Sequence, residues 1–414
     1  MNIRLLFLFI TIAITGCNSN PSNSNSTYLN KPSGPYSVGF QDYHYINQQA
    51  CPDTNYVPNL NESYFSPENT NYCHEIMLRV YYPTDTKISK TTTSYYYPAI
   101  LQIKNTVSLD QSISTQQIES LNFLTSWTLE SASITSGTFP IVMFIPGSQD
   151  QVQTYENLIT NLVSYGYIVV GINSLFINGD IELPNGTVVP GIVPNSESDA
   201  YRTYFPEQYK DVEFIYHQIK TNHNLNIPIF KTMDLNHIGA FAHSLGNLSV
   251  IHMAHENPTL FKSVISLDDA IVDAYLPTAL ESIPNPTLYQ FAALTYTNLR
   301  QSHQLPNLIE SSEYLAVISP NAENESYSYH MNFSDFSTLQ YHPTITKFFD
   351  YLSSINQPIV SPFNGYDITH TIDIYLVSFF NTYLKDESST IFNTDNCKPL
   401  TNNSFVFCGP HSND

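Results

Sequence analysis

The chain is short of positive charge. Of its 414 residues only 15 are Lys or Arg, against 36 Asp or Glu, and the formal net charge at pH 7 is −21. Proteins that bind nucleic acid need a basic surface to neutralise phosphates, so this composition argues against that class. It also argues against tight electrostatic binding to anionic lipid surfaces. No nucleic-acid partner is therefore expected.

The body of the chain also lacks long apolar runs, internal repeats and Pro- or Gly-rich linkers. Without a run of about 18 or more apolar residues, no internal membrane span is expected. Hydrophobic residues make up 42% of the chain, with 30 Tyr and 24 Phe, which is typical of a folded protein. Because no linker divides the chain, we expect one catalytic domain over 34–385 and a C-terminal tail over 386–414.

Cysteine is scarce, and the first of its five positions predicts an anchor. Residues 1–16 contain one basic residue, an apolar run too short to span a bilayer, and small residues before Cys17. The stretch Ile14-Thr15-Gly16-Cys17 resembles a bacterial lipobox, in which the Cys is lipid-modified and becomes the new N-terminus. We therefore expect a signal peptide over 1–16, a flexible tether over 17–33, and an exported lipoprotein at the outer membrane or cell surface. An ordinary signal peptide cut nearby is the alternative.

The remaining four cysteines predict disulfides, because an exported chain meets an oxidising environment. Proximity in sequence favours one pair near each end of the fold, Cys51–Cys73 and Cys397–Cys408. Reduced or partly buried thiols are the alternative. The spacing fits no zinc module, so no metal is expected.

Short apolar runs alternate with segments of helical periodicity from Ile141 onward. Runs typical of buried parallel strands occur at Ile141–Ile145, Tyr167–Ile172, Ser263–Leu267, Pro286–Leu294 and Tyr314–Ile318. Helices are predicted over 155–165, 209–221 and 369–385. The pattern predicts an α/β fold, with a mostly parallel central sheet and helices on both faces. Two polar stretches, 84–138 and 177–195, are interpreted as excursions from the sheet.

The segment His237–Gly246, H-I-G-A-F-A-H-S-L-G, contains the candidate nucleophile, Ser244. A strand-length apolar run precedes Ser244, and residues with helical spacing follow it. Small residues, Ala242 and Gly246, stand two positions before and two positions after it. This pattern is typical of a nucleophile elbow, a sharp strand-to-helix turn that lifts the Ser hydroxyl above the sheet. An ordinary strand-to-helix turn is the alternative.

A serine nucleophile needs a base to take its proton and an acid to orient that base. In doubly wound hydrolases the acid follows the nucleophile in the chain, at the end of a later strand. Asp268 is the first residue beyond the predicted strand Ser263–Leu267, so it is favoured over its competitors Asp269 and Asp273.

The base should come last in the chain, and there are 13 His to choose from. His243 adjoins the nucleophile, but adjacent residues on an elbow point in different directions, so we expect it to be a packing neighbour. His330 and His342 both follow the predicted strand Tyr314–Ile318, where a loop carrying the base belongs. His330 opens H-M-N-F-S-D-F, whose Phe333 and Phe336 could anchor the loop. A surface His on an aromatic-rich loop is the alternative.

Three motifs resemble the plasma-type platelet-activating factor acetylhydrolase family. They are A-H-S-L-G at 242–246, L-D at 267–268 and H-M-N-F-S-D-F at 330–336, where the family has G-H-S-x-G-G, L-D and H-x-N-F-x-D-F. The stretches G-P-Y-S-V-G at 34–39 and R-V-Y-Y-P at 79–83 also resemble its N-terminal strands. The similarity runs from about Gly34 to Lys385.

The resemblance implies an α/β-hydrolase in which Ser244 is the nucleophile, Asp268 the orienting acid and His330 the base. The backbone N–H groups of Leu245 and Ser148 would form the oxyanion hole. No metal or cofactor is implied. The implied substrates are phospholipids with short or oxidised acyl chains, cleaved in a phospholipase A2-type reaction.

Two features depart from the family pattern. Ala242 and Asn247 replace the outer glycines of the elbow, and Pro146 stands where the family usually has His before Gly147. The second departure bears on the shape of the acyl pocket. A general short-chain or polyester esterase on the same scaffold is an alternative function, because the substrate pocket is expected to involve the unmatched excursions 84–138 and 177–195. A surface binding protein that keeps the fold without the chemistry is another. The sequence leaves the oligomeric state open.

Overall fold

The computed structural model describes residues 28–47, 74–91, 93–107, 110, 112–193, 204–268, 283, 285–295, 298, 314–318, 328–355, 358–361, 364–388, 392 and 404–408. The predicted signal peptide, the anchor Cys17, and three cysteines of the predicted disulfides lie outside these ranges: Cys51, Cys73 and Cys397. Of Cys408 only the backbone is described. Among the described helices, none combines the length and the hydropathy that crossing a membrane requires.

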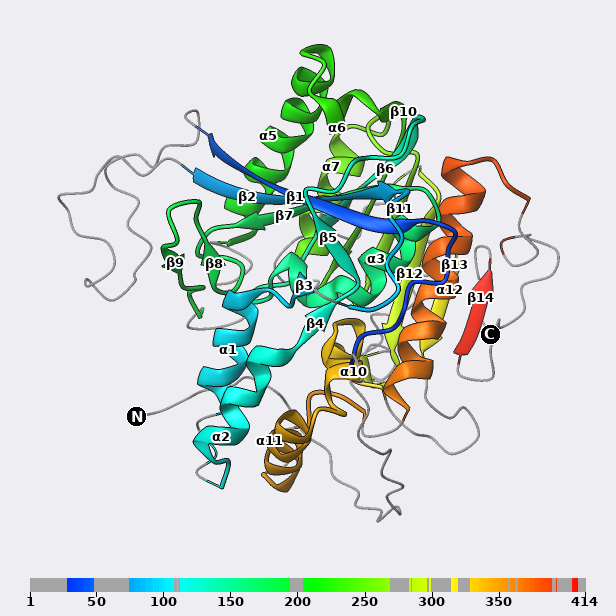
Figure 1. Ribbon diagram of the computed structural model, residues 1–414. Helices are drawn as coiled ribbons and strands as arrows, with labels where there is room; N and C mark the ends of the chain where they lie inside the picture. The colour runs from blue at the N-terminus through cyan, green and yellow to red at the C-terminus, as the bar shows by residue number, and fades with distance from the viewer. Residues whose placement is uncertain are drawn as a thin grey trace.

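A ten-stranded sheet forms the centre of the molecule, in the order β14-β13-β12-β11-β10-β6-β7-β2-β1-β5 (Figure 1). The strands from β13 to β7 run parallel. Strands β14, β2 and β1 pair antiparallel with their inner neighbours, and the short β5 pairs parallel with β1. The bounds are β1 Ser37–Asn47, β2 His74–Thr84, β5 Thr128–Glu130, β6 Phe139–Ile145, β7 Ile168–Ser174, β10 Met233–His243, β11 Ser263–Leu267, β12 Thr287–Ala292, β13 Tyr314–Ile318 and β14 Ser404–Cys408.

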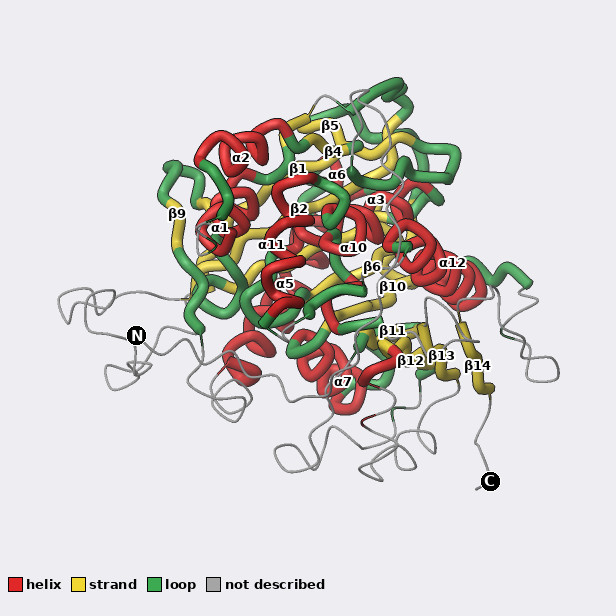
Figure 2. The backbone as a smooth tube through the Cα atoms, turned by 90° about the horizontal axis from the view of Figure 1, so that it is seen from below, coloured by secondary structure: helices red, strands yellow, loops and turns green. Residues whose placement is uncertain are grey.

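Helices cover both faces of the sheet because its central strands are apolar on both faces. In β6, Ile141, Met143 and Ile145 belong to one hydrophobic core, while Val142 and Phe144 belong to the other. Helices α5, α6 and α7 complete the first core, and α3 and α12 complete the second (Figures 1 and 2). The predicted α/β architecture is confirmed. The bounds are α3 Glu156–Ser164, α5 Phe205–Asn224, α6 Pro228–Lys231, α7 Gly246–Glu256 and α12 Gly365–Leu384.

The predicted strands and helices occur where the sequence placed them, with shifted ends. The last helix, α12, begins four residues earlier than predicted, at Gly365 rather than Thr369. A Cβ atom on Gly365 would lie 1.7 Å from the Ser337 carbonyl oxygen, so only glycine allows this close approach. Strand β2 contains Pro83, which pairs with Val38 of the neighbouring strand β1, and it continues to Thr84.

The stretch 84–138 differs from the expectation of a simple excursion, because its last part, β5, extends the sheet at the β1 edge. Its helices α1 Tyr97–Val107, α2 Thr115–Glu119 and η3 Ser120–Phe123 (a 3₁₀ helix) pack with the later helices α10 Phe336–Leu339 and α11 Pro343–Ser354 into a separate hydrophobic cluster beside the sheet. Its short strands β3 Thr93–Ser94 and β4 Thr125–Ser126 pair antiparallel with each other.

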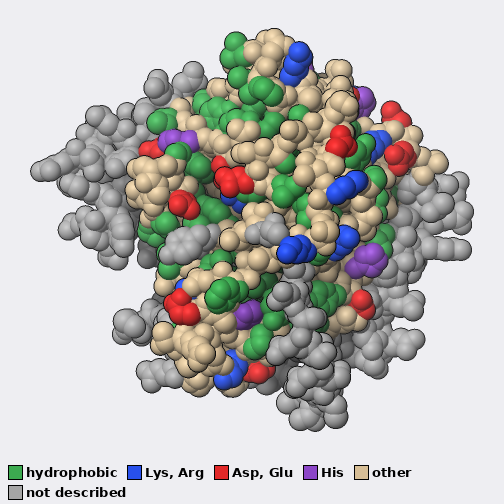
Figure 3. Space-filling view, in the orientation of Figure 1, with side chains coloured by type: hydrophobic (Ala, Val, Ile, Leu, Met, Phe, Trp, Pro, Cys, Tyr) green, Lys and Arg blue, Asp and Glu red, His purple; other side chains and the backbone are tan. Residues whose placement is uncertain are grey.

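The other polar stretch, 177–195, contains a small hairpin of β8, Ile181–Glu182, and β9, Val188–Val189. Strand β14 was not expected, since it lies in the segment predicted to be a tail. Figure 2 shows it beside β13, with β12 and β11 next in line. On the face seen in Figure 3, Lys and Arg side chains are scattered among Asp and Glu.

Candidate active site

The candidate nucleophile sits in a sharp turn between β10 and α7. Ser244 has a φ of 53°, which is rare for a residue with a side chain and is typical of a nucleophile elbow. A Cβ atom on Gly246 would lie 2.4 Å from the Ile145 carbonyl oxygen, and Ala242 is fully buried. The Ser244 N–H donates to the Leu267 carbonyl at 3.1 Å, which ties the turn to β11. The geometry therefore has the small flanking residues that the sequence pattern predicted.

Asp268 lies directly beyond β11 and is completely buried. Its Oδ1 accepts a hydrogen bond from the Ala292 N–H at 2.7 Å, and its Oδ2 accepts one from the Thr295 hydroxyl at 3.0 Å. The Nδ1 atom of His330 is 2.7 Å from the same Oδ2. Three donors therefore fix the carboxylate in the orientation that an imidazole partner requires.

His330 begins the 3₁₀ helix η7, His330–Phe333, and its side chain is 24% exposed. A neutral His330 that donates Nδ1–H to Asp268 carries its lone pair on Nε2, the atom that accepts a proton in general-base catalysis. The competing residue, His342, lies elsewhere: its Nδ1 accepts from the Thr344 N–H at the start of α11. Burial lowers the pKa of His342 to about 4. The structure therefore brings His330, and not His342, to Asp268.

The loop after β6 lies against the nucleophile. A Cβ atom on Gly147 would be 3.0 Å from the Ser244 Cβ, so this position needs glycine. Asn178 donates to the Gly147 carbonyl at 3.0 Å and holds the loop from the second excursion. Within the described ranges, the N–H groups of Leu245 and Ser148 donate no hydrogen bond to the protein. Two unused donors beside a candidate nucleophile are what an oxyanion hole requires.

His243 is the packing neighbour that the sequence predicted. It is fully buried, and its ring lies 4.3 Å from the His330 ring, centroid to centroid, at 32°. Burial, and then the charge of His330, hold the pKa of His243 well below its usual value. Ligand atoms of His243, Asp268 and His330 lie within 4.8 Å of one another. Both His243 nitrogens have protein partners, however, Tyr155 and the His330 carbonyl, which leaves neither for a metal ion.

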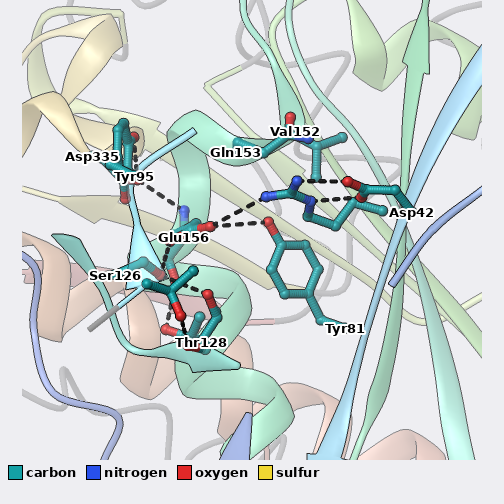
Figure 4. A network of polar contacts seen from close by, with 12 residues as sticks. Asp42, Tyr81, Tyr95, Ser126, Thr128, Val152, Gln153, Glu156 and Asp335 are labelled. Carbon is teal, nitrogen blue, oxygen red and sulfur yellow. Dashed lines mark hydrogen bonds and ion pairs between the residues drawn. The ribbon is translucent and has the colours of Figure 1, made fainter. Parts of the chain in front are cut away.

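Asp335, which no sequence pattern singled out, binds the His330 segment to the start of α3. Its Oδ1 accepts from the Asn157 N–H at 2.8 Å, and its Oδ2 accepts from the Glu156 N–H at 3.0 Å and the Tyr95 hydroxyl at 2.8 Å (Figure 4). The Asp335 N–H donates to the Thr154 carbonyl at 2.7 Å. The sequence shows Asp335 as the sixth residue of H-M-N-F-S-D-F, but it does not show the hydrogen-bond partners of its carboxylate. Of the aromatic residues expected to anchor this loop, Phe333 is 1% exposed and Phe336 is partly buried.

A buried arginine, Arg79, lies near the start of α3, the helix that Asp335 binds. Arg79 donates from Nε and Nη2 to the two carboxylate oxygens of Asp42, both at 2.7 Å, and its guanidinium lies over the Phe40 ring. Its Nη1 is 3.9 Å from Oε1 of Glu156, whose pKa burial raises to about 7. The β1–β2 hairpin is therefore joined through Glu156 to α3, the helix that holds the His330 segment.

Comparisons with known proteins identify the fold. No family model matches the chain, and no curated protein matches its sequence. Among solved structures 610 chains match, including a ferulic acid esterase from Streptomyces cinnamoneus with a TM-score of 0.66. The match covers 91% of this chain and 98% of that chain, at 15% sequence identity.

This chain has the α/β-hydrolase fold.

Within that α/β-hydrolase fold, Ser244 and Asp268 follow the adjacent strands β10 and β11, and His330 lies in the segment after β13. An α/β-hydrolase fold hosts many activities, so the reaction has to be argued from these residues.

Proposed function

We propose that the protein is a serine hydrolase of carboxylic esters that works through an acyl-enzyme. The observation that carries the proposal is the 2.7 Å contact between His330 Nδ1 and Asp268 Oδ2 beside an elbow serine, Ser244. An imidazole oriented by a buried carboxylate is the arrangement that activates a serine hydroxyl. This mechanism requires no metal and no cofactor.

In the proposed reaction, Ser244 Oγ attacks the ester carbonyl while His330 Nε2 takes the Oγ proton. The carbonyl oxygen becomes an oxyanion held by the N–H groups of Leu245 and Ser148. The C–O bond to the alcohol then breaks, and His330 returns the proton to the leaving oxygen. Water attacks the acyl-enzyme in the same way and releases the acid. Asp268 keeps its hydrogen bond to His330 Nδ1–H and stabilises the imidazolium that forms.

For the substrate, we propose phospholipids with short or oxidised acyl chains. The support is the set of motifs similar to platelet-activating factor acetylhydrolases, at 242–246, 267–268 and 330–336. Two residues of the last motif have separate tasks, since His330 contacts Asp268 and Asp335 binds the start of α3. A general short-chain or polyester esterase is the second candidate, and the fold shared with a ferulic acid esterase favours testing aromatic esters too.

The test is a panel of esters given to the wild type and to Ser244→Ala. The panel contains p-nitrophenyl acetate and octanoate, ethyl ferulate, and phosphatidylcholines with acetyl or palmitoyl at the sn-2 position. We expect kcat/KM of the wild type to be about tenfold or more higher for the sn-2 acetyl lipid than for the sn-2 palmitoyl lipid or for ethyl ferulate. A preference for ethyl ferulate or simple esters would favour the general esterase. No turnover, and no labelling of Ser244 by a fluorophosphonate, would leave only a binding protein.

Gly246→Ala should damage the elbow. The added methyl group meets the Ile145 and Pro146 carbonyl oxygens, so α7 and Ser244 must shift. A displacement of this kind near a reacting atom is expected to lower kcat by about 100-fold. The measurement is kcat on p-nitrophenyl acetate, with the melting temperature as a check on folding. Ala242→Gly, on the other side of the nucleophile, removes a methyl group and should stay within about threefold of wild type.

We also propose that a lipid on Cys17 anchors the protein to a membrane, on the basis of the lipobox-like Ile14-Thr15-Gly16-Cys17 and the apolar run before it. Cys17→Ser should remove the lipid and move the protein from the membrane fraction to the soluble fraction. Fractionation and mass spectrometry of the N-terminus measure both changes. A wild type that is wholly soluble, with its N-terminus at another residue, would contradict the anchor.

A further inference from the structure

Three polar side chains link the loop of the candidate oxyanion hole to the main chain of His330. The Asp150 Oδ2 atom lies 2.9 Å from the Tyr155 hydroxyl, and that hydroxyl lies 2.7 Å from His243 Nδ1. At the other side of the ring, His243 Nε2 lies 3.2 Å from the His330 carbonyl oxygen. We call Asp150, Tyr155 and His243 the His330 relay. None of the three has a role in the proposed acyl transfer.

The relay lies close to the nucleophile. A Cβ atom on Gly147 would lie 3.4 Å from Asp150 Oδ2, 3.4 Å from His243 Nδ1 and 3.0 Å from the Ser244 Cβ. Its members come from three elements: the loop after β6, the 3₁₀ helix η4 (Val152–Tyr155) and the last residue of β10. The relay therefore connects the main chain of His330 with the loop that carries Ser148.

The hydrogen atoms of the relay can be assigned from its last member backwards. The His330 carbonyl can only accept, so His243 Nε2 must donate to it. His243 is neutral, because burial and the His330 charge disfavour its cationic form. A neutral imidazole has a single N–H, so Nδ1 is an acceptor and Tyr155 donates to it. Since the Tyr155 hydrogen is then used, a hydrogen bond to Asp150 needs a proton on Asp150.

Ionisation of Asp150 breaks this sequence of donors. If Tyr155 turns its hydrogen toward the carboxylate, His243 Nδ1 faces an oxygen lone pair. If His243 changes tautomer to donate from Nδ1, its bare Nε2 faces the His330 carbonyl. In either case one hydrogen bond of the relay is lost. Because the groups left unpaired are buried, the relay then positions His330 less firmly.

The groups around Asp150 allow it to carry a proton in a useful pH range. Burial raises its pKa to about 6, although the Tyr155 hydrogen bond and the charge of His330 act in the opposite direction. The pKa of Tyr155 is raised, first by burial and then by the charge of Asp150, with a further contribution from Asp335. Tyr155 therefore stays a donor, and Asp150 is the member of the relay that changes charge.

We propose that Asp150, Tyr155 and His243 position His330 for catalysis, and that this relay is complete only while Asp150 is protonated. The inference rests on the proposed ester hydrolysis. The relay is complete below the pKa of Asp150 and loses a hydrogen bond above it, whereas His330 must be neutral to act as a base. The two ionisations therefore act on kcat in opposite directions as the pH rises.

Asp150→Asn tests the pH dependence. The Asn amide can donate to the Tyr155 oxygen at every pH, so the variant keeps the relay in its complete form. The ratio of kcat for Asp150→Asn to kcat for the wild type should rise by about 3- to 10-fold between pH 5 and pH 8, the effect of one hydrogen bond. A ratio that is constant or falls over this range would overturn the proposal. Tyr155→Phe removes the hydroxyl that connects Asp150 to His243. In the Tyr155→Phe background, the ratio of kcat with Asp150→Asn to kcat without it should therefore not change with pH.

His243→Gln and His243→Leu form a matched pair that tests positioning. Gln can donate to the His330 carbonyl and accept from Tyr155, whereas Leu fills the space without polar atoms. We expect His243→Leu to lower kcat by about 10- to 100-fold with KM within about threefold, and His243→Gln to recover most of the loss. Equal activities in the two variants, at unchanged melting temperatures, would remove His243 from the relay.

The rate of fluorophosphonate labelling of Ser244 separates failure of this inference from failure of the proposed function. A wild type that neither cleaves esters nor reacts with the probe contradicts the hydrolase itself. A wild type that reacts, with relay variants that react at the same rate and with the same pH dependence, contradicts only the relay. Labelling slowed in His243→Leu and restored in His243→Gln supports it.

Discussion

Replacing Ser244 or His330 by Ala is expected to lower kcat by about six orders of magnitude, and replacing Asp268 by Ala by about four. Ser244 supplies the attacking oxygen and His330 the base, so neither loss can be compensated by the remaining residues. Asp268 acts through His330, which it holds at 2.7 Å, and its loss leaves a misoriented imidazole that still works to a small extent. The measurement is kcat on p-nitrophenyl acetate, with circular dichroism to confirm folding.

The double variants give a sharper version of this test. Because the three residues act as a unit, Ser244→Ala combined with His330→Ala should be no slower than Ser244→Ala alone. His342→Ala is the matched control, since His342 caps α11 away from Asp268 and should leave kcat within about threefold of wild type. Activity that survives His330→Ala and disappears in His342→Ala would transfer the base to His342.

Asp335→Ala is expected to loosen the His330 segment from the rest of the fold. The change leaves the buried N–H groups of Glu156 and Asn157 and the Tyr95 hydroxyl without an acceptor. Each such group costs about 1–3 kcal/mol, so we expect a loss of about 3 kcal/mol or more in the free energy of unfolding. Because His330 is five residues away on the same segment, kcat should also fall by about 100-fold.

Urea denaturation and kcat on p-nitrophenyl acetate measure the two effects of Asp335→Ala. Asp367 provides the control, because it lies in the first turn of α12 but is exposed there. Asp367→Ala removes a carboxylate from a helix start without stranding buried donors, so it should cost less than about 1 kcal/mol. Equal free energies of unfolding in the two variants would show that Asp335 contributes no more than an exposed helix-terminal carboxylate.

Much of this arrangement was predictable because parallel strands bring their carboxyl ends to one edge of a sheet. Ser244 and Asp268 each follow a strongly apolar strand, so chain order alone placed them near each other. Choosing His330 over His342 required the longer motif H-M-N-F-S-D-F, because both follow β13 and periodicity does not separate them.

The strands and contacts that the sequence did not predict depend on partners that are distant in sequence. Strand β5 has three residues, too few for an alternating pattern, and it becomes a strand only by pairing with β1. Strand β14 pairs with β13 from a segment that resembles a tail. Asp335 carries no local signal for its role, since its acceptor oxygens are matched to donors on α3 and to Tyr95. The same holds for the contact between Tyr155 and His243.

The buried carboxyl groups around α3 make folding a proton-binding reaction. Burial raises the pKa of Glu156 to about 7 and that of Asp150 and Asp335 to about 6, so the folded chain holds protons that the unfolded chain has released. Stability from this source is complete below the ordinary carboxyl pKa and is lost as the pH rises through about 4 to 7. We expect a melting temperature at least about 3 °C higher at pH 5.5 than at pH 8, and a smaller difference in Glu156→Gln. An equal or lower value at pH 5.5 would contradict this. The contribution of these three carboxyl groups to the free energy of unfolding is thus expected to be larger in mildly acidic solution than above neutral pH.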